Sequence, residues 1–188
     1  MNINKTFIKI WSIDLDKSTN KYSIINHFIP PEWQLYLVSD GSLTNNLRLI
    51  KEDYLSLTLI KQEKQLYYSL TFNEKLKIPD DNNILITREI WLTNIIKTKF
   101  LFAKSYYKTN NIYMDLISYK KPLGASFVES EIEIYRRIHS IYYGYSHILE
   151  KEFKIRGPIW GRSYDILCNN EIIFLIHEFF SPISIDKI

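Results

Sequence analysis

The sequence of 188 residues contains a single cysteine, only five glycines and six prolines. One cysteine excludes an internal disulfide and a zinc site built from several cysteines, and it fits a reducing compartment. Cys168 lies in an apolar stretch directly before Asn169-Asn170, with no basic neighbour that would activate the thiol. We therefore expect a structural role for Cys168 at the end of a strand.

Long apolar runs are also absent. The longest run, residues 172–176, has the length of a strand and falls far below the roughly 18 residues that cross a bilayer. The first residues lack the apolar segment of a signal peptide and the Arg- and Ser-rich character of a transit peptide. We expect no membrane span and a protein that is used where it is made.

Neither positive nor negative charge is in large excess. The formal net charge is only +3 and the basic residues are spread along the chain, which argues against a nucleic-acid partner. Hydrophobic residues make up 46% and charged residues 24%, an ordinary globular composition that argues against disorder. The length predicts a single domain over residues 1–188, with its core at about 31–182.

The motifs of the common catalytic and metal sites are missing too. The chain has no glycine-rich phosphate loop, HExxH, CxxC or GxSxG pattern. Asp14-Leu15-Asp16 begins like a calcium loop but lacks the required glycine and distal glutamate. We therefore expect no metal and no cofactor, and a structural role for each of the four histidines.

What is present is a pattern of short strands and helices. Pro31 suits the first turn of a helix that includes Trp33, Leu35 and Leu37. Alternation and apolar runs predict strands at 54–60, 84–95, 100–107, 159–167 and 172–180. Asn169-Asn170 predicts the turn of a hairpin, because asparagine tolerates positive φ. The fold class is therefore α+β, an antiparallel sheet with helices packed on one face.

One further helix is expected at 130–153. Within this segment apolar residues recur at helical spacing: Ile134, Ile138, Ile141, Tyr145, Ile148 and Leu149. Gly157-Pro158 follows the segment and suits the end of a helix.

Charged residues inside the apolar strands are the most informative candidates for a site. Arg88 and Glu89, Lys104, and Glu178 each interrupt an apolar strand. A charge in a buried strand is costly unless it is paired or needed. Two interpretations stand: structural ion pairs or edge residues, or a polar site with cations for an anion and a carboxylate for a hydroxyl or proton. His177 and Glu178 point to opposite faces of their strand and would not act together.

Six segments follow one another in this order: 37–44 (LVSDGSLT), 87–92 (TREIWL), 102–105 (FAKS), 121–124 (KPLG), 160–163 (WGRS) and 177–182 (HEFFSP). In these segments the sequence resembles the chorismate lyase family, and most of all its plastid-encoded Ycf21 branch. The resemblance covers about residues 33–182. The family fold is an antiparallel sheet with helices around an enclosed site, in agreement with the predicted elements.

The resemblance implies an enzyme that converts chorismate to 4-hydroxybenzoate and pyruvate without a cofactor, and so supplies a quinone ring precursor. It implies that Arg88 grips a carboxylate and that Glu178 bonds the ring hydroxyl. Leu43 and Leu123 match positions that contribute backbone N–H groups to substrate binding. Lys104 and Arg162 complete the expected substrate-binding residues.

The sequence departs from the bacterial members of the family near these positions. Lys104 stands where they have arginine, which keeps the charge but loses the planar fork. Asn45-Asn46 replaces basic residues, and a double arginine after Trp-Gly is reduced to Arg162. A thinner set of charges bears on rate and on substrate identity more than on fold.

Two alternatives to the enzyme remain. The first is a non-catalytic module that binds a small aromatic acid, because the fold resembles effector-sensing domains of bacterial regulators, although no DNA-binding segment precedes residue 30. The second is a fold that has lost its site, against which Arg88 and Glu178 count.

The 31 Ile, 18 Lys and 14 Asn suit an AT-rich plastid genome, so we expect a plastid-encoded stromal protein, otherwise a cytoplasmic one. We expect a monomer.

Overall fold

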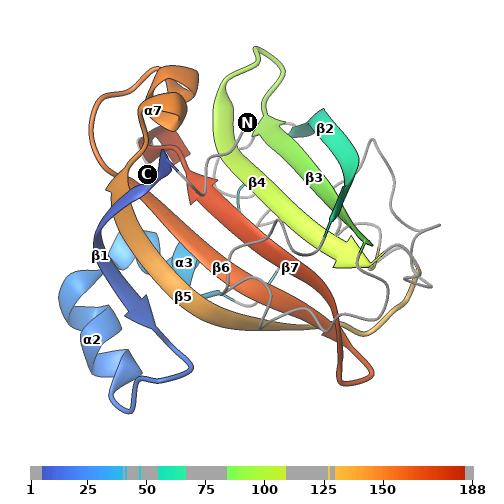
Figure 1. Ribbon diagram of the computed structural model, residues 1–188. Coiled ribbons are helices and arrows are strands. Elements are labelled where there is room, and N and C mark those ends of the chain that lie inside the picture. The colour runs from blue at the N-terminus through green and yellow to red at the C-terminus, as the bar shows by residue number, and fades with distance from the viewer. Residues whose placement is uncertain are drawn as a thin grey trace.

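The computed structural model of the protein describes residues 6–39, 41, 47, 55–66, 84–108, 127 and 130–184. In these ranges seven strands form one sheet in the order β1-β5-β6-β7-β4-β3-β2, with every neighbouring pair antiparallel (Figure 1). The strands are β1 (Ile8–Asp14), β2 (Ser56–Leu66), β3 (Ile84–Thr93), β4 (Lys99–Lys108), β5 (Tyr135–Tyr145), β6 (Ile159–Cys168) and β7 (Glu171–Phe180). The helices in the described ranges are α2 (Lys21–Phe28), α3 (Pro31–Leu37) and α7 (His147–Phe153), with a 3-10 turn, η3 (Pro182–Ser184), after β7. The predicted α+β class is confirmed.

Tight turns join two pairs of neighbouring strands. Asn169 and Asn170 connect β6 to β7 with φ values of 50° and 65°, so the predicted asparagine turn is confirmed. Between β3 and β4, the Thr98 N–H donates to Asn94 Oδ1 at 2.9 Å, and Lys97 has a φ of 63°. Cys168 is buried at the end of β6, as expected for a structural residue.

The predicted helix at 130–153 is wrong over most of its length. Residues 135–145 form β5, and only His147–Phe153 is helical. A register shift between Ile138 and Ser140 explains the misleading spacing. Because a β-bulge inserts one extra residue, Ile138 and Ile141 lie three residues apart yet pack in the same apolar cluster. The bulge therefore gives the apolar residues of this strand a helix-like spacing in the sequence.

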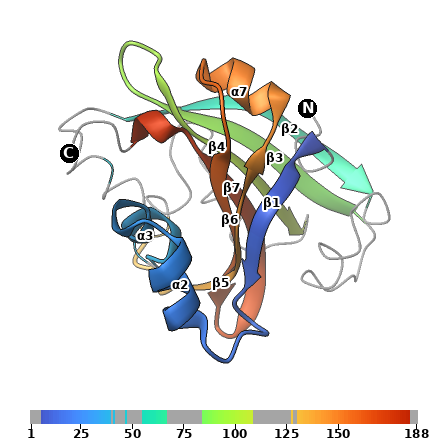
Figure 2. The ribbon, with the colours of Figure 1, turned by 90° about the vertical axis from the view of Figure 1, so that its left-hand side faces the viewer.

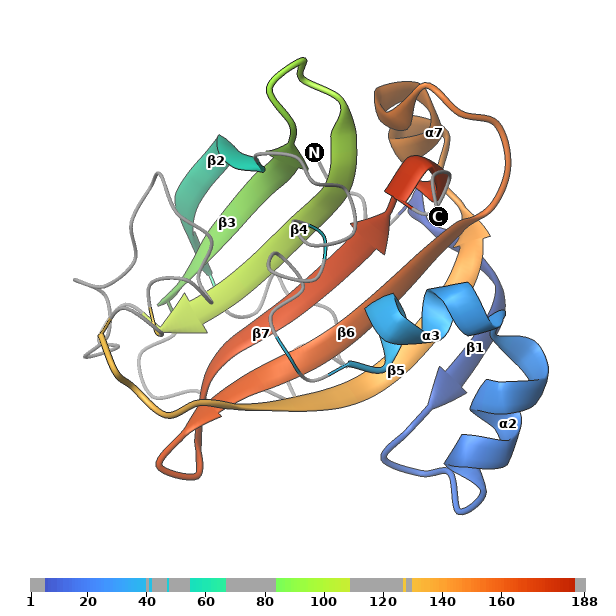
Figure 3. The ribbon, with the colours of Figure 1, turned by 180° about the vertical axis from the view of Figure 1, so that it is seen from behind.

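Among the described helices, α2 and α3 cover one face of the sheet, which we call the helix face (Figures 2 and 3). Pro31 begins α3, as predicted. The buried residues of α2 and α3 pack against the sheet in one cluster, with Trp33 ring centroids 6.3 Å from both Trp160 and Phe180. The sequence did not predict β1 or α2.

Helix α7 packs on the opposite face, which we call the outer face. The Ser146 side chain caps α7 by accepting from the Leu149 N–H, and Lys154 ends the helix in the left-handed conformation. Phe153 of α7 lies 5.3 Å from Trp91, ring centroid to ring centroid. Helices therefore lie on both faces of the sheet, where the sequence predicted one. None of the helices in the described ranges is long and apolar enough to span a membrane.

Candidate functional site

Arg162 and Glu178 form the polar centre of the helix face. Arg162 on β6 and Glu178 on β7 are directly paired in register. The Arg162 Nε–H donates to Glu178 Oε2 at 2.8 Å, and the two residues are 1% and 6% exposed. Bonds between charged groups are among the strong hydrogen bonds in proteins, so this contact fixes the carboxylate on the sheet.

Tyr164 holds the other oxygen of the same carboxylate. Its hydroxyl donates to Glu178 Oε1 at 2.9 Å. Burial raises the pKa of the Tyr164 phenol, and the nearby Glu178 charge raises it further, so the phenol keeps its proton. The Arg162 guanidinium carbon also lies 5.0 Å from the Tyr164 ring centroid and 5.7 Å from that of Phe180, within the range of cation–π attraction.

Arg162 also connects this centre to the chain after α3. Its Nη1–H donates to the backbone oxygen of Ser39 at 2.9 Å. One guanidinium thus joins the Glu178 carboxylate to residue 39, which belongs to the first segment of the resemblance described above. This connection makes Arg162 more central to the arrangement than the sequence indicated.

Arg88 lies on the same face, two strands away from Glu178. Its register partner on β4 is Ser105, which pairs with Ile176 on β7, and Ile176 is two residues from Glu178. Strand spacings of about 4.8 Å and residue rises of about 3.3 Å put the two Cα atoms about 12 Å apart. Arg88 is 1% exposed. A buried cation and a buried carboxylate therefore stand on one face, separated by the small side chains of Ser105 and Ala103 on β4.

Apolar clusters flank this polar pair on both sides. On one side lie residues of α2, α3 and the nearby strand ends, among them Trp33, Trp160 and Phe180. On the other side lies a second cluster that includes Tyr107, Phe127 and Phe174. An arginine at one end, a carboxylate at the other and an apolar cluster on either side of the pair suit a flat organic acid that carries a hydroxyl group.

Lys104 lies on the outer face, away from Arg88. Lys104 pairs in register with Glu89 on β3, and its Nζ is 3.0 Å from Glu89 Oε1. Their side chains are 8% and 3% exposed. Because successive residues of a strand alternate between faces, the neighbour of Glu89, Arg88, points the other way. The structure therefore does not bring Lys104 together with Arg88, Arg162 and Glu178.

Polar residues form a row on the outer face that crosses all seven strands. Its members are linked by register from β2 to β1: Lys61, Glu89, Lys104, His177, Ser163, Ser140 and Asp14. His177 and Glu178 point to opposite faces, as predicted, since Lys104 pairs with His177 and Ala103 with Glu178. The row explains Lys104 as part of a polar stripe on the outer face.

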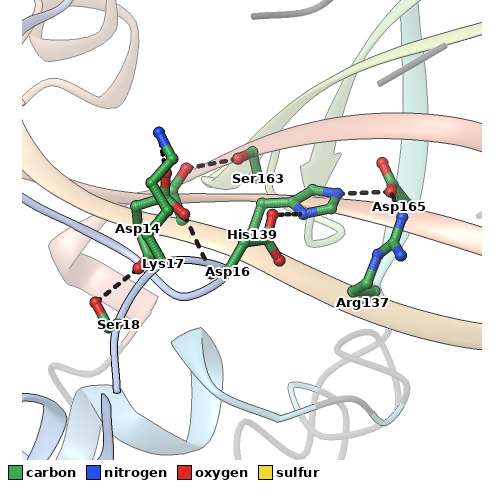
Figure 4. A network of polar contacts seen from close by, with 9 residues as sticks. Asp14, Asp16, Lys17, Ser18, Arg137, His139, Ser163 and Asp165 are labelled. Atoms are coloured by element: carbon green, nitrogen blue, oxygen red, sulfur yellow. Dashed lines mark hydrogen bonds and ion pairs between the residues drawn. The ribbon is translucent and has the colours of Figure 1, made fainter. Parts of the chain in front are cut away.

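A network around His139 continues this row toward β1 (Figure 4). His139 Nδ1 lies 2.7 Å from Asp16 Oδ2, and Nε2 lies 2.6 Å from Asp165 Oδ2. Arg137 Nη2–H also donates to Asp165 Oδ2 at 2.8 Å. His139 occupies the β5 bulge and lies between two carboxylates, an arrangement that suits the structural role predicted for it. Among the described residues, no group of three or more potential ligands is arranged to hold a metal ion.

Leu43 and Leu123, the two positions expected to offer backbone N–H groups, lie outside the described residues. Their roles stay predictions. Tyr164 is a site residue that the sequence patterns did not indicate. Its signal was the strand alternation itself, because Tyr164 stands two residues after Arg162 and so shares its face.

Comparison with known proteins gives a consistent set of relatives. The chorismate pyruvate-lyase Rv2949c-like family matches residues 37–187. The Ycf21 protein of Antithamnion sp. is 33% identical over 186 residues, covering 97% of this chain and 95% of that protein. The Ycf21 protein of Porphyra purpurea is 34% identical over 160 residues, covering 84% and 85%.

Solved structures show the same fold at low sequence identity. The effector domain of PhnF from Mycobacterium smegmatis is similar with a TM-score of 0.60 at 10% identity, covering 78% of this chain and 91% of that domain. The C-terminal domain of the histidine utilization repressor from Pseudomonas syringae gives a TM-score of 0.53 at 5% identity, covering 70% and 94%. At such identities the likeness concerns the fold alone.

Proposed function

Because the chain belongs to the chorismate pyruvate-lyase Rv2949c-like family, we propose that it converts chorismate to 4-hydroxybenzoate and pyruvate without a cofactor. The observation that carries this proposal is the placement of Arg88 and Glu178, both buried, on one face between two apolar clusters. In this proposal the Arg88 guanidinium binds the ring carboxylate, for which its planar fork is suited. Glu178 accepts a hydrogen bond from the ring hydroxyl.

The reaction asks little of the protein beyond orientation and electrostatics. The bond between the ring and the enolpyruvyl oxygen breaks, a ring proton leaves, and the ring becomes aromatic. The methylene carbon of the leaving enolpyruvate gains a proton and pyruvate results. Aromatisation supplies the driving force, so the site has to hold the substrate in a reactive geometry and exclude water. The roles of Leu43 and Leu123 as backbone donors remain part of the proposal.

The proposed site does not include Lys104, and Arg162 has a larger role in it than the sequence indicated. Lys104 lies on the outer face with Glu89. Arg162 instead sits against Glu178 and supplies positive charge next to the end of the site where the C–O bond breaks. Such fixed charge stabilises negative charge that develops in a transition state.

The test is to mix purified protein with chorismate and follow 4-hydroxybenzoate and pyruvate by chromatography. Arg88→Met and Glu178→Gln should each abolish product formation, because each removes one of the two anchors. The matched control is the double variant Lys104→Met/Glu89→Gln, which removes a buried pair of the same charges from the outer face and should keep the activity. Wild-type protein that forms no product would overturn the enzymatic proposal.

A second candidate function is the binding of a small aromatic acid without turnover. The similarity of the fold to the PhnF effector domain supports it. Titration calorimetry with 4-hydroxybenzoate separates the two candidates. Binding that requires Arg88, in a protein that leaves chorismate unchanged, would favour the sensor.

We also propose that the protein acts as a monomer in the plastid stroma and feeds the ring of a prenylated quinone. The Ile-, Lys- and Asn-rich composition and the similarity to Ycf21 proteins support the location. Immunoblotting of fractionated plastids tests it, and a signal confined to another compartment would contradict it. Light scattering during size exclusion tests the monomer.

A further inference from the structure

We infer that Tyr164 and Arg162 act together as positioning residues that fix Glu178 as a hydrogen-bond acceptor, so that the site selects acids with a hydrogen-bond donor opposite the carboxylate. This inference rests on the proposed function, because it takes Glu178 as the group that meets the far end of the ligand. It adds a residue, Tyr164, and a rule for which ligands bind.

The geometry gives each oxygen of Glu178 its own donor. Tyr164 reaches Oε1 at 2.9 Å and Arg162 Nε reaches Oε2 at 2.8 Å. The two donors stand two residues apart on β6, on the same face as Glu178 on the paired strand β7. All three residues are buried. Two contacts on two oxygens set both the position and the plane of the carboxylate.

Each of these partners donates. A guanidinium has N–H donors and no acceptor, and its positive charge favours a negative carboxylate next to it. The Tyr164 hydroxyl keeps its proton, because burial and the Glu178 charge raise the pKa of the phenol. Glu178 therefore accepts from both sides, and the lone pairs that remain on its oxygens can only accept again.

Because Glu178 can only accept hydrogen bonds, it favours ligands that donate one. A hydroxyl or amino group at the far end of the ring can donate to Glu178. A methoxy group has no proton to donate, and a carboxylate in the place of that donor would put a like charge directly against Glu178. A hydrogen bond to a charged group is worth about a ten- to hundredfold change in affinity. The ligand class is thus a flat acid with a donor about one ring away from its carboxylate.

A first experiment uses the wild-type protein alone, so its result does not depend on whether a variant folds. Titration calorimetry should give the lowest Kd for 4-hydroxybenzoate and 4-aminobenzoate. Benzoate should bind at least about tenfold more weakly, and 4-methoxybenzoate and terephthalate more weakly still. Equal affinities for all five acids, or binding of none of them, would overturn the inference.

A second experiment assigns the selectivity to Tyr164. In Tyr164→Phe the ratio of the benzoate Kd to the 4-hydroxybenzoate Kd should fall severalfold, because the Glu178 carboxylate loses one of its two hydrogen-bond donors. The benzoate Kd itself should stay the same. The matched control is Tyr142→Phe, another buried tyrosine whose hydroxyl donates one hydrogen bond, at 3.0 Å to the backbone oxygen of Arg162, from the outer face. That variant should change neither Kd.

The outcomes separate this inference from the proposed function. Selective binding that depends on Tyr164, in a protein that does not turn over chorismate, would support the positioning role and refute the lyase. Turnover of chorismate with an unchanged ligand ratio in Tyr164→Phe would refute the positioning role and support the lyase. A loss of affinity for benzoate and 4-hydroxybenzoate alike would show that Tyr164 matters only for structure.

Discussion

Lys104 Nζ and Glu89 Oε1 lie 3.0 Å apart on the outer face of the sheet, although Glu89 is the sequence neighbour of Arg88 on the helix face. The contact is buried, so each partner compensates the charge of the other. Removing one partner of a buried ion pair leaves an uncompensated charge, whereas removing both is often nearly neutral. The pair therefore contributes to stability in a way that depends on both members.

This pair gives the first prediction. Lys104→Met should lower the free energy of unfolding by about 3–5 kcal/mol, and adding Glu89→Gln should restore most of that loss. Urea denaturation of the wild type, the two single variants and the double variant measures the coupling. The double variant should bind 4-hydroxybenzoate like the wild type. A marked loss of affinity in that variant would place Lys104 in the binding site after all.

The second prediction concerns Gly161, between Trp160 and Arg162. A Cβ atom at this position would lie 2.3 Å from Tyr142 Cε2 and 2.8 Å from the Glu178 backbone oxygen. Gly161→Ala should therefore push the paired strands apart beneath Glu178, lower the free energy of unfolding by about 1–3 kcal/mol and weaken ligand binding.

Gly41 provides the control for that variant. Among the described residues, a Cβ atom there would meet only Ser39 Oγ, at 3.3 Å, so Gly41→Ala should be tolerated. Thermal unfolding and titration calorimetry on both variants check the prediction. Equal stability of Gly161→Ala and the wild type would mean that the strands adjust without cost.

The third prediction concerns alkaline pH. The pKa of Tyr164 in the folded protein is raised above its ordinary value of 10.0. As the pH rises past 10, the unfolded chain loses the phenolic proton while the folded protein keeps it, so the unfolded state binds fewer protons and the free energy of unfolding falls. The stabilising contribution is complete below pH 10 and is lost progressively above it.

Tyr164→Phe removes this titration. Urea denaturation at several pH values above 10 should give a shallower decline of the free energy of unfolding in the variant, by up to about 1.4 kcal/mol per pH unit. Lysines and other tyrosines titrate in both proteins and cancel in the comparison. Between pH 7 and 9 the two slopes should agree, which serves as the internal control. Parallel declines above pH 10 would contradict the raised pKa.

Local sequence patterns predicted most of the sheet, because strands carry their signal in adjacent residues. The strands β3, β4, β6 and β7 and the Asn169-Asn170 turn all came from alternation, apolar runs and turn chemistry. The segment of β5 did not, because its bulge at His139 breaks the alternation and creates helical spacing. Recognising a bulge requires knowing the partner strand, which lies far away in the sequence.

The candidate site was predictable only in part, for a related reason. Alternation tells which neighbours within one strand share a face, so it separated His177 from Glu178. It cannot tell whether Lys104 shares a face with Arg88, because that depends on the register of β3 against β4. A slip of one residue would pair Lys104 with Arg88 instead of Glu89. The register shift between Leu92 and Thr93, near the turn, sets the observed pairing.

The fourth prediction concerns His139, which joins the β1 end of the sheet to its centre. The imidazole lies between Asp16 in the turn after β1 and the buried Asp165 on β6. In addition, the Leu15 N–H donates to the His139 backbone oxygen. His139→Phe keeps an aromatic ring at this position but removes both nitrogen atoms. Of the two partners of the Asp165 carboxylate, His139 and Arg137, the variant keeps Arg137.

We expect His139→Phe to lower the free energy of unfolding by about 1.5–3 kcal/mol, the worth of a hydrogen bond to a charged group. The loss should be local at first, so amide hydrogen exchange should accelerate in residues 8–18 before it does in β6 and β7. His27→Phe, at an exposed position of α2, is the control and should stay within about 0.5 kcal/mol of the wild type. Because the network lies on the outer face, the affinity of His139→Phe for 4-hydroxybenzoate should stay unchanged. Faster exchange throughout β6 and β7, with weaker ligand binding, would mean instead that the network supports the site on the helix face through the sheet.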